Sequence, residues 1–349
     1  MTTVALGIDQ LSRPQPGGTA TYVRGLIHGL AEIAPNLTLV GVGPRDAPAV
    51  PGLSRVVRVP LPVRALTPLW ARSDLGFPRA AVWHATSLAG PLGRSRAARR
   101  TLLVHDLLWR DVPTLFTPRG VAFHEANYQR LKRHEATTAL VTSEATAARL
   151  LDDGFHPERV AVIRLGVNAS VTPDDERAKA LLTAAGVEGP FFLVVGTVEP
   201  RKNLARLAAA VRQSPELPPV VVVGPQGWSR ENLTGLVLLG PQDAAVLAAL
   251  RASARAHVFV PLAEGWGLPA VEALAAGRPL LVSSTVPSTP SASDARRVDP
   301  TDLDALVVGL HEVLAIDDST TARAARVAST ATLTWAACAR DHLAVWQCA

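Results

Sequence analysis

Two glutamates in the segment VPLAEGWGLPAVEALAAGRP (260–279) have the residue type and spacing of a ligand-binding site. Glu264 stands in a glycine-containing loop, and Glu272 stands one turn into the helix that Pro269 is suited to begin. The intervening glycines allow the backbone to approach a ligand closely, and a helix start offers unpaired N–H groups at the positive end of its dipole. We therefore predict an anion-binding site here. In the alternative interpretation, Glu272 only complements the helix dipole and Glu264 is a solvated acid.

A pair of cations in VVGTVEPRKNLARL (194–207) points to the same chemistry. After a strand the chain turns at Thr197, and Arg201 and Lys202 stand at the start of a helix that Asn203 can cap. Cations are electrostatically unfavourable at a helix start unless a negative group lies there. Lys202 is also one of only three lysines in the chain, and a compact ammonium suits a diphosphate oxygen. The pattern favours a diphosphate site, with a surface basic pair as the alternative.

Two weaker signals lie in the first half of the chain. In PQPGGTATYVRGL (14–26), Gly18 belongs to a loop that Thr19 would end as a helix cap. Its backbone amides would contact a phosphate or sugar, or the loop is a plain turn. In VHDL, His105 follows a buried strand, and it is either a functional histidine or a structural one.

The elements that position these residues are short β-branched runs alternating with amphipathic stretches. In the first half, strands are predicted at 4–9, 37–43, 55–60, 81–85, 101–106, 139–144 and 160–165, and helices at 21–33, 119–136 and 145–152. In the second half, strands are predicted at 191–196, 219–224, 236–240, 256–262 and 279–284, and helices at 203–213, 243–255, 269–276 and 302–315. The end of the chain, 319–347, is predicted as one or two helices.

This alternation of apolar strands and helices is typical of parallel sheets covered on both faces. The polar stretch 166–190 separates the two series. We therefore predict an α/β fold of two doubly wound, Rossmann-like domains facing across a cleft. Ligands bind outside the carboxyl ends of the strands in such sheets, which is where the glutamates and cations stand.

Composition excludes several classes of protein. With 349 residues, 48% of them hydrophobic and 19% charged, the chain is globular and long enough for two domains. Its apolar runs are strand-length and no export signal is apparent, so we expect a cytoplasmic protein. The net charge of +5 comes from basic residues interspersed with acids, which does not favour nucleic-acid binding. No dinucleotide, Walker A or metal-site motif occurs, so we expect no metal and no cofactor.

The motifs together resemble a known family. The strings EGWGLPAVE (264–272) and EPRKN (199–203), with GGTATYVRGL, VHDL, TSEAT and LGVN, resemble the retaining GT-B glycosyltransferases of glycosyltransferase family 4, in particular bacterial mannosyltransferase-like members. The resemblance runs from about residue 15 to about residue 312, and Trp335 resembles the aromatic position of the family's last helix. It implies the GT-B fold, with an N-terminal acceptor-binding domain at 1–168, a C-terminal donor-binding domain at 169–329, and a helix at 330–349 that crosses back.

The resemblance also implies residue roles. Glu264 would contact the donor sugar, Glu272 the ribose, Arg201 and Lys202 the diphosphate, and His105 the reacting centre. The remaining donor-contacting positions are Gly18, Thr197, Gly224, Gly265, Trp266, Gly267 and Leu268. Of these, Thr197 departs from the family, because many members have arginine there.

The function implied is transfer of a hexose, with mannose the first choice, from a nucleoside-diphosphate sugar such as GDP-mannose. The acceptor would be a hydroxyl of a glycan, a lipid-linked molecule or a small molecule, the configuration would be retained, and no metal would be needed. The resemblance also implies a role in cell-envelope polysaccharide synthesis. A nucleotide-sugar epimerase of GT-B architecture and a non-catalytic nucleotide-sugar-binding protein remain alternatives. Basic segments at 94–100 and 119–134 would allow peripheral contact with an anionic membrane, or are solvated.

Overall fold

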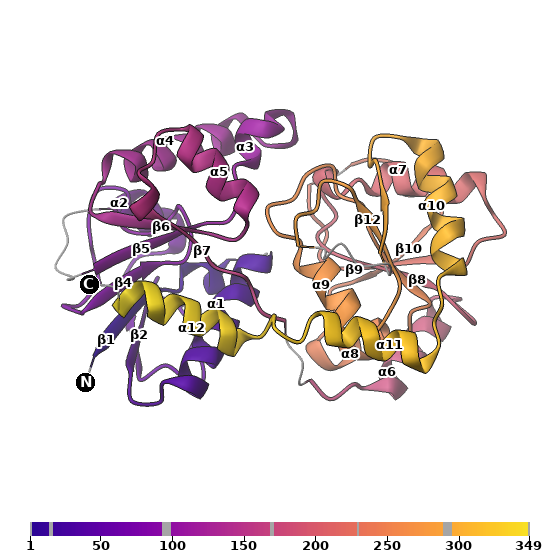
Figure 1. Cartoon of the computed structure of the whole chain (residues 1–349), viewed down its shortest axis with the longest axis horizontal. Helices are drawn as coiled ribbons and strands as arrows, with labels where there is room; N and C mark the ends of the chain where they lie inside the picture. Colours follow the sequence, from indigo (N-terminus) through magenta and orange to yellow (C-terminus); the bar gives the residue numbers. More distant parts are fainter. Residues whose placement is uncertain are drawn as a thin grey trace. The chain divides into compact units, whose positions relative to one another are not determined.

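The chain divides into two compact units. The computed structural model describes residues 2–13, 17–92, 99–167, 171–228, 230–288 and 295–347. Unit 1 comprises Met1–Gly166 together with Leu333–Ala349, and unit 2 comprises Val167–Thr332 (Figure 1). Asn168 of the LGVN motif, which is also the predicted domain boundary, and most of the basic segment 94–100 lie outside the described residues. No helix among the described residues is long and apolar enough to cross a membrane.

Unit 1 contains a parallel sheet with the strand order β3-β2-β1-β4-β5-β6-β7. Its strands are β1 (Thr3–Gly7), β2 (Thr38–Gly43), β3 (Arg55–Arg58), β4 (Val82–Ala85), β5 (Arg99–Val104), β6 (Thr137–Val141) and β7 (Val160–Val162). Its helices are α1 (Gly17–Ile33), α2 (Val63–Trp70), α3 (Leu108–Asp111), α4 (Pro118–Arg133), α5 (Glu144–Asp152) and α12 (Trp335–Gln347). The strands predicted for the first half are confirmed. Thr19 lies inside α1, so its prediction as a helix cap is wrong.

Unit 2 contains a second parallel sheet with the order β10-β9-β8-β11-β12-β13. Its strands are β8 (Phe192–Val195), β9 (Val220–Val223), β10 (Leu236–Gly240), β11 (Ala256–Phe259), β12 (Leu280–Ser283) and β13 (Ala295–Val298). Its helices are α6 (Asp175–Ala184), α7 (Leu204–Gln213), α8 (Ala244–Ser253), α9 (Leu268–Ala275), α10 (Leu303–Ala315) and α11 (Thr320–Ser329). The five strands predicted here are confirmed, and β13 is an addition.

The central strands of unit 2 are buried on both faces. Phe192 and Val194 of β8 pack with α7 and α10 on one face. Leu193, between them, packs with α6 and α8 on the other. This explains why the strand sequence is continuously apolar instead of alternating. Strands β8 and β11 of this sheet end at the loops that carry the predicted site.

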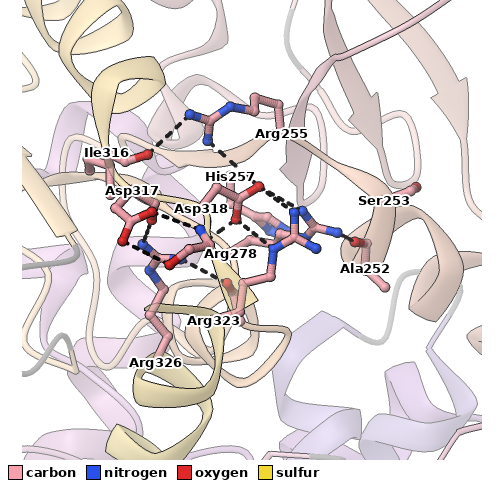
Figure 2. A network of polar contacts seen from close by, with 12 residues as sticks. Ala252, Ser253, Arg255, His257, Arg278, Ile316, Asp317, Asp318, Arg323 and Arg326 are labelled. Carbon is pink, nitrogen blue, oxygen red and sulfur yellow. Dashed lines mark hydrogen bonds and ion pairs between the residues drawn. The ribbon is translucent and has the colours of Figure 1, made fainter. Parts of the chain in front are cut away.

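An arginine cluster ties the helix ends of unit 2 to α11 (Figure 2). Asp318, just before α11, accepts ion pairs from Arg278 at 3.1 Å, Arg323 at 2.7 Å and the fully buried Arg326 at 3.7 Å. The arginines also donate hydrogen bonds to main-chain carbonyls at or just after the ends of other helices. Arg278 donates to the carbonyl of Ala252, Arg326 to that of Gly277, and Arg255 to that of Ile316. These carbonyls have no partner within their own helices. One carboxylate therefore organises the ends of α8, α9 and α10.

Helix α12 packs along α1 in unit 1 (Figure 1). Trp335, the first residue of α12, is 4% exposed. A Cβ added to Gly25 would lie 2.1 Å from its indole ring, and one added to Gly29 would lie 2.2 Å from its carbonyl oxygen. Two glycines four residues apart on α1 therefore form the groove that receives Trp335.

Substitution of Gly29 by alanine tests this groove. Because the obstructing atom is main chain, α12 must shift, and Gly29→Ala is expected to lower the free energy of unfolding by about 2 kcal/mol, as overpacking does. Chemical denaturation measures the change. The control is Gly120→Ala in α4, where an added Cβ meets only the Thr117 hydroxyl at 3.1 Å and helix propensity favours alanine. Equal stability of Gly29→Ala and wild type would contradict the assignment.

Candidate active site

Glu264, Lys202 and Arg201 meet at the carboxyl ends of β8 and β11 in unit 2. The Glu264 Oε2 atom accepts hydrogen bonds from Lys202 Nζ at 2.7 Å and from Arg201 Nη1 at 2.9 Å. The loops that carry them are joined by their main chains, because the amide of Leu262 donates to the carbonyl of Arg201 at 2.9 Å. The structure thus brings Glu264 together with two predicted residues, Arg201 and Lys202, that lie about 60 positions before it in the sequence.

The cluster is electrostatically balanced. Burial by itself would raise the pKa of Glu264, but the charges of Lys202 and Arg201 outweigh it and bring that pKa to about 2. Arg201 also donates from Nη2 to Glu199 Oε1 at 2.8 Å, and Glu199 is buried. Two cations therefore face two carboxylates. The negative partner that we predicted for the cations is therefore provided by two carboxylates of the protein, Glu264 and Glu199.

A small hollow lies beside Lys202. Gly196, Thr197 and Phe259 help to line it, and the Lys202 ammonium lies 5.0 Å from the Phe259 ring centroid. A cation over an aromatic face is stabilised without losing its charge. Lys202 is therefore held in place by one carboxylate and one ring, and the predicted Thr197 lies at the same hollow.

Asn203 has a different role from the one predicted. It does not cap α7; it adopts a left-handed conformation with φ of 61° after the short 3-10 turn Pro200–Lys202. Its side-chain amide donates to the carbonyls of Val260 at 3.1 Å and Pro300 at 2.8 Å. Asparagine tolerates this backbone conformation better than most residues do. The correction is that Asn203 fixes the cation-bearing turn to the end of β11.

The loop Gly265–Gly267 is tightly packed at Gly267. Gly267 has φ of 101°, and an added Cβ would lie 2.6 Å from Val286. Ser288 holds the loop, since its amide donates to the carbonyl of Trp266 at 3.1 Å and its hydroxyl to that of Gly267 at 2.9 Å. Helix α9 then begins at Leu268 with a proline in its first turn, as predicted. Pro269 has no N–H group and the Ala270 amide donates to the carbonyl of Gly267 at 3.0 Å, so an anion at this helix start would be met by the amides that precede Pro269.

Glu272 lies on α9 and is paired with a residue that the sequence did not suggest. Its Oε2 accepts from Arg251 of α8 at 2.5 Å. Burial raises the pKa of Glu272 despite this charged partner. The dipole-complement alternative does not describe it, because its partner is a side chain of another helix.

Gly224, after β9, is required by chain packing. A Cβ there would lie 2.0 Å from the carbonyl oxygen of Gly196. The turns that end β8 and β9 therefore touch through their main chains. Such contact explains the glycine whether or not a ligand lies nearby.

The remaining predicted residues, His105 and Gly18, belong to unit 1. His105 follows β5, and its Nε2 bonds to the carbonyl of Thr86 at 3.0 Å; since a carbonyl only accepts, Nε2 carries the proton. Burial lowers the pKa of His105, so the ring is neutral at pH 7. Gly18 is the second residue of α1, one turn before Tyr22, whose ring meets His105 edge to face at 5.6 Å.

Sequence reasoning missed several partners at the site. In the sequence, Glu199 is only part of a motif, and neither Arg251 nor Tyr22 stands out as a site residue. Arg251 gave no local signal, because nothing near position 251 resembles a site. Within the described residues, no group of three or more His, Cys, Asp or Glu side chains is arranged to hold a metal ion.

Part of the chain matches a family of known proteins. Residues 183–328 match the family model of the glycosyl transferases group 1. The O-antigen chain mannosyltransferase B of Escherichia coli is 33% identical over 144 residues, which are 37% of this chain and 38% of that protein. Overall, the matched segments span 14% to 58% of the lengths of the curated relatives.

Solved structures extend the likeness to the whole chain. Sucrose-phosphate synthase from Thermosynechococcus elongatus superposes with a TM-score of 0.76, at 20% identity, over 99% of this chain and 98% of that one. Anabaena HepE, solved in complex with UDP and glucose, gives a TM-score of 0.74 at 13% identity over the full length of both chains. The chain therefore has the GT-B fold of two Rossmann-like units, and residues 183–328 carry its match to the glycosyl transferases group 1.

Proposed function

We propose that the protein is a retaining glycosyltransferase that moves a hexose from a nucleoside-diphosphate sugar to a hydroxyl group. The observation that carries the proposal is the half-buried cluster of Glu264, Lys202 and Arg201 at the strand ends of unit 2. It lies within the segment that matches the glycosyl transferases group 1. The bound UDP in Anabaena HepE, a protein of the same fold, supports a nucleotide donor.

The cluster suits the charge that develops in this reaction. Departure of a nucleoside diphosphate places negative charge on the leaving phosphate while the sugar becomes oxocarbenium-like. Fixed cations stabilise that charge where it forms, and we assign this role to Lys202 and Arg201, together with the amides that precede Pro269. Glu264 accepts hydrogen bonds from the sugar hydroxyls. The acceptor hydroxyl attacks from the face of the leaving group, whose phosphate takes the proton.

The other predicted residues complete the proposed donor site. Glu272 accepts hydrogen bonds from the ribose hydroxyls. The donor also contacts main chain at Thr197, Gly224 and the loop Gly265–Leu268. In unit 1, His105 acts at the reacting centre as a neutral imidazole, and Gly18 brings its backbone to the substrate. Unit 1 binds the acceptor and unit 2 the donor.

The finer assignments rest on relatives and on charge. The E. coli relative is named as a mannosyltransferase, which supports GDP-mannose as donor and a glycan or lipid-linked acceptor of the cell envelope. Arg130, Lys132 and Arg133 lie in the last turn of α4 and support peripheral contact with an anionic membrane face. Arginine, lysine and helix amides supply the positive charge that the leaving group needs, so we propose that transfer is independent of metal.

Replacement of Lys202 by alanine tests the donor site. Calorimetry with GDP, UDP, ADP and dTDP in the presence of a chelator is expected to show binding of one nucleotide to the wild type. Lys202→Ala is expected to weaken that binding about 10-fold and to lower transfer by about 100-fold, because one of the two cations that balance the leaving charge is lost. Exposed Lys179 of α6 provides the control, since Lys179→Ala changes the net charge equally. Unchanged binding and transfer in Lys202→Ala would refute the assignment.

A further inference from the structure

We infer that Tyr22 is a positioning residue for His105, and that a single chain of hydrogen bonds beginning and ending on α12 fixes Tyr22. The inference rests on the proposed function in one respect, namely the role of His105 at the reacting centre. Its structural part concerns unit 1 alone. It gives α12 a part in the chemistry although none of its residues belongs to the predicted site.

Five buried side chains from four elements form the chain. The Tyr22 hydroxyl of α1 lies 2.6 Å from His84 Nε2 of β4 and 2.8 Å from His342 Nε2 of α12. His84 Nδ1 lies 2.8 Å from the hydroxyl of Thr101, on β5. The indole N–H of Trp346 donates to that hydroxyl at 3.1 Å. At the other end, His342 Nδ1 lies 2.8 Å from the carbonyl of Cys338.

Counting protons gives every bond a direction. The Cys338 carbonyl only accepts, so His342 carries its proton on Nδ1 and offers Nε2 as an acceptor. The Tyr22 hydroxyl must then donate to His342, and its oxygen accepts from His84 Nε2. The bare Nδ1 of His84 accepts from Thr101, whose oxygen accepts from Trp346. Each donor and each acceptor of the chain is used once.

This arrangement requires both histidines to be neutral. Burial lowers the pKa of His84 well below its ordinary value and that of His342 to about 4, so both are neutral at pH 7. A proton added to His342 would force Tyr22 to donate to His84 instead and would leave the Thr101 proton without an acceptor. While both histidines are neutral, the hydroxyl of Tyr22 can therefore donate only to His342 and accept only from His84, which fixes its orientation.

The fixed phenol ring in turn bounds His105. The rings of Tyr22 and His105 meet edge to face, with centroids 5.6 Å apart and planes at 85°, a favourable aromatic geometry. The opposite constraint is the bond from His105 Nε2 to Thr86, whose own hydroxyl donates to the carbonyl of Gly7 at 2.7 Å. His105 is thus held between Thr86, which follows β4, and Tyr22 of α1. On the α1 side, its position depends on the hydrogen bonds that fix Tyr22.

Tyr22→Phe tests this inference, because it keeps the ring and removes the hydroxyl. We expect a kcat about 10-fold lower, with a KM for the donor within about 2-fold of wild type, because a small misplacement of a catalytic group lowers the rate without removing ground-state binding. The imidazole proton resonances of His105, assigned by their absence in His105→Gln, are expected to shift. Trp346→Phe cuts the same chain at its far end and is expected to shift these resonances in the same direction.

Arg340→Ala is the matched control, since Arg340 is an exposed residue of α12 that takes no part in the chain of hydrogen bonds. It is expected to leave kcat and the His105 resonances unchanged. If Tyr22→Phe and Trp346→Phe lower the melting temperature but leave kcat and the His105 resonances at their wild-type values, α12 has only a structural role and the inference is overturned. If the wild type transfers no sugar, the proposed function fails, while the His105 resonances still decide whether the chain holds that ring.

Discussion

Glu264→Gln is expected to lower sugar transfer strongly and, at the same time, to tighten the binding of the free nucleoside diphosphate. Glutamine has nearly the same shape but no charge, so the cluster of two cations and two carboxylates gains one net positive charge. Lys202 and Arg201 then no longer have to leave a half-buried carboxylate in order to meet a phosphate. We expect about 10-fold tighter binding of the diphosphate product and transfer lower by about 1,000-fold, since the proposed partner of the sugar hydroxyls is lost.

The outcome separates two roles of one residue. In the free protein Glu264 is paired with Lys202 and Arg201, and with the donor bound it would turn to the sugar hydroxyls. Only the intact donor, which carries those hydroxyls, would therefore offset the loss of the ion pairs. Calorimetry with the diphosphate and a product assay measure the two effects. Glu199→Gln is the matched control, because it raises the local charge equally but leaves Glu264 in place; it should tighten diphosphate binding and keep transfer measurable. Weaker diphosphate binding in Glu264→Gln than in wild type would contradict this account.

The fold could be predicted from sequence to the extent that its signals were local. Buried strands such as FFLVVG and PVVVVG are apolar throughout because both faces of the sheet are covered, and this pattern is visible in one short window. Strand β13, with the sequence ARRV, was missed because it lies at the edge of its sheet and its two arginines are exposed. Helix α6 was missed because it lies in the polar stretch interpreted as the break between the units.

The candidate site was predictable in its residues but not in its pairings. Glycines, a helix start and clustered charges mark strand ends in any α/β sheet, so Glu264, Lys202 and Gly267 could be identified from the sequence. The bond between Lys202 and Glu264, however, joins residues 62 positions apart, and that between Tyr22 and His342 joins residues 320 apart. Such partners depend on strand order, which periodicity does not give. The same reason explains why Asn203 was expected to cap a helix locally and instead holds a distant strand.

Asp318→Asn is expected to cause the largest loss of stability among these variants. The substitution removes a carboxylate that pairs with Arg278, Arg323 and the fully buried Arg326, while the bonds of Arg278 and Arg326 to main-chain carbonyls remain. Removing one partner of a buried ion-pair network leaves uncompensated charge in a poorly solvated place, which costs about 3–5 kcal/mol. In a unit of this size that corresponds to a melting temperature lower by about 10 °C or more. Differential scanning calorimetry measures the change.

The free energy of unfolding at acid pH gives an independent check on the Asp318 carboxylate. Burial would raise the pKa of Asp318, but the hydrogen bond from Arg323 and the charges of Arg278 and Arg323 hold it below its ordinary value. The folded state therefore binds this proton less readily than the unfolded chain does, so the stabilisation is present above the unfolded pKa of about 3.9 and is lost as the pH falls through the folded value. Asp318→Asn should thus lose stability at pH 7 and be less sensitive to acid than wild type.

The neighbouring Asp317 supplies the control for this prediction. Its carboxylate accepts from the amide and hydroxyl of Ser319 at 2.8 and 2.9 Å at the exposed start of α11, so Asp317→Asn should change stability far less. If Asp318→Asn melted with the wild type, the arginines would be satisfied by the main-chain carbonyls alone. Because α11 leads directly into α12, a loosened Asp318 network should also raise hydrogen exchange in the segment 330–334 before it does so in β8 or β11.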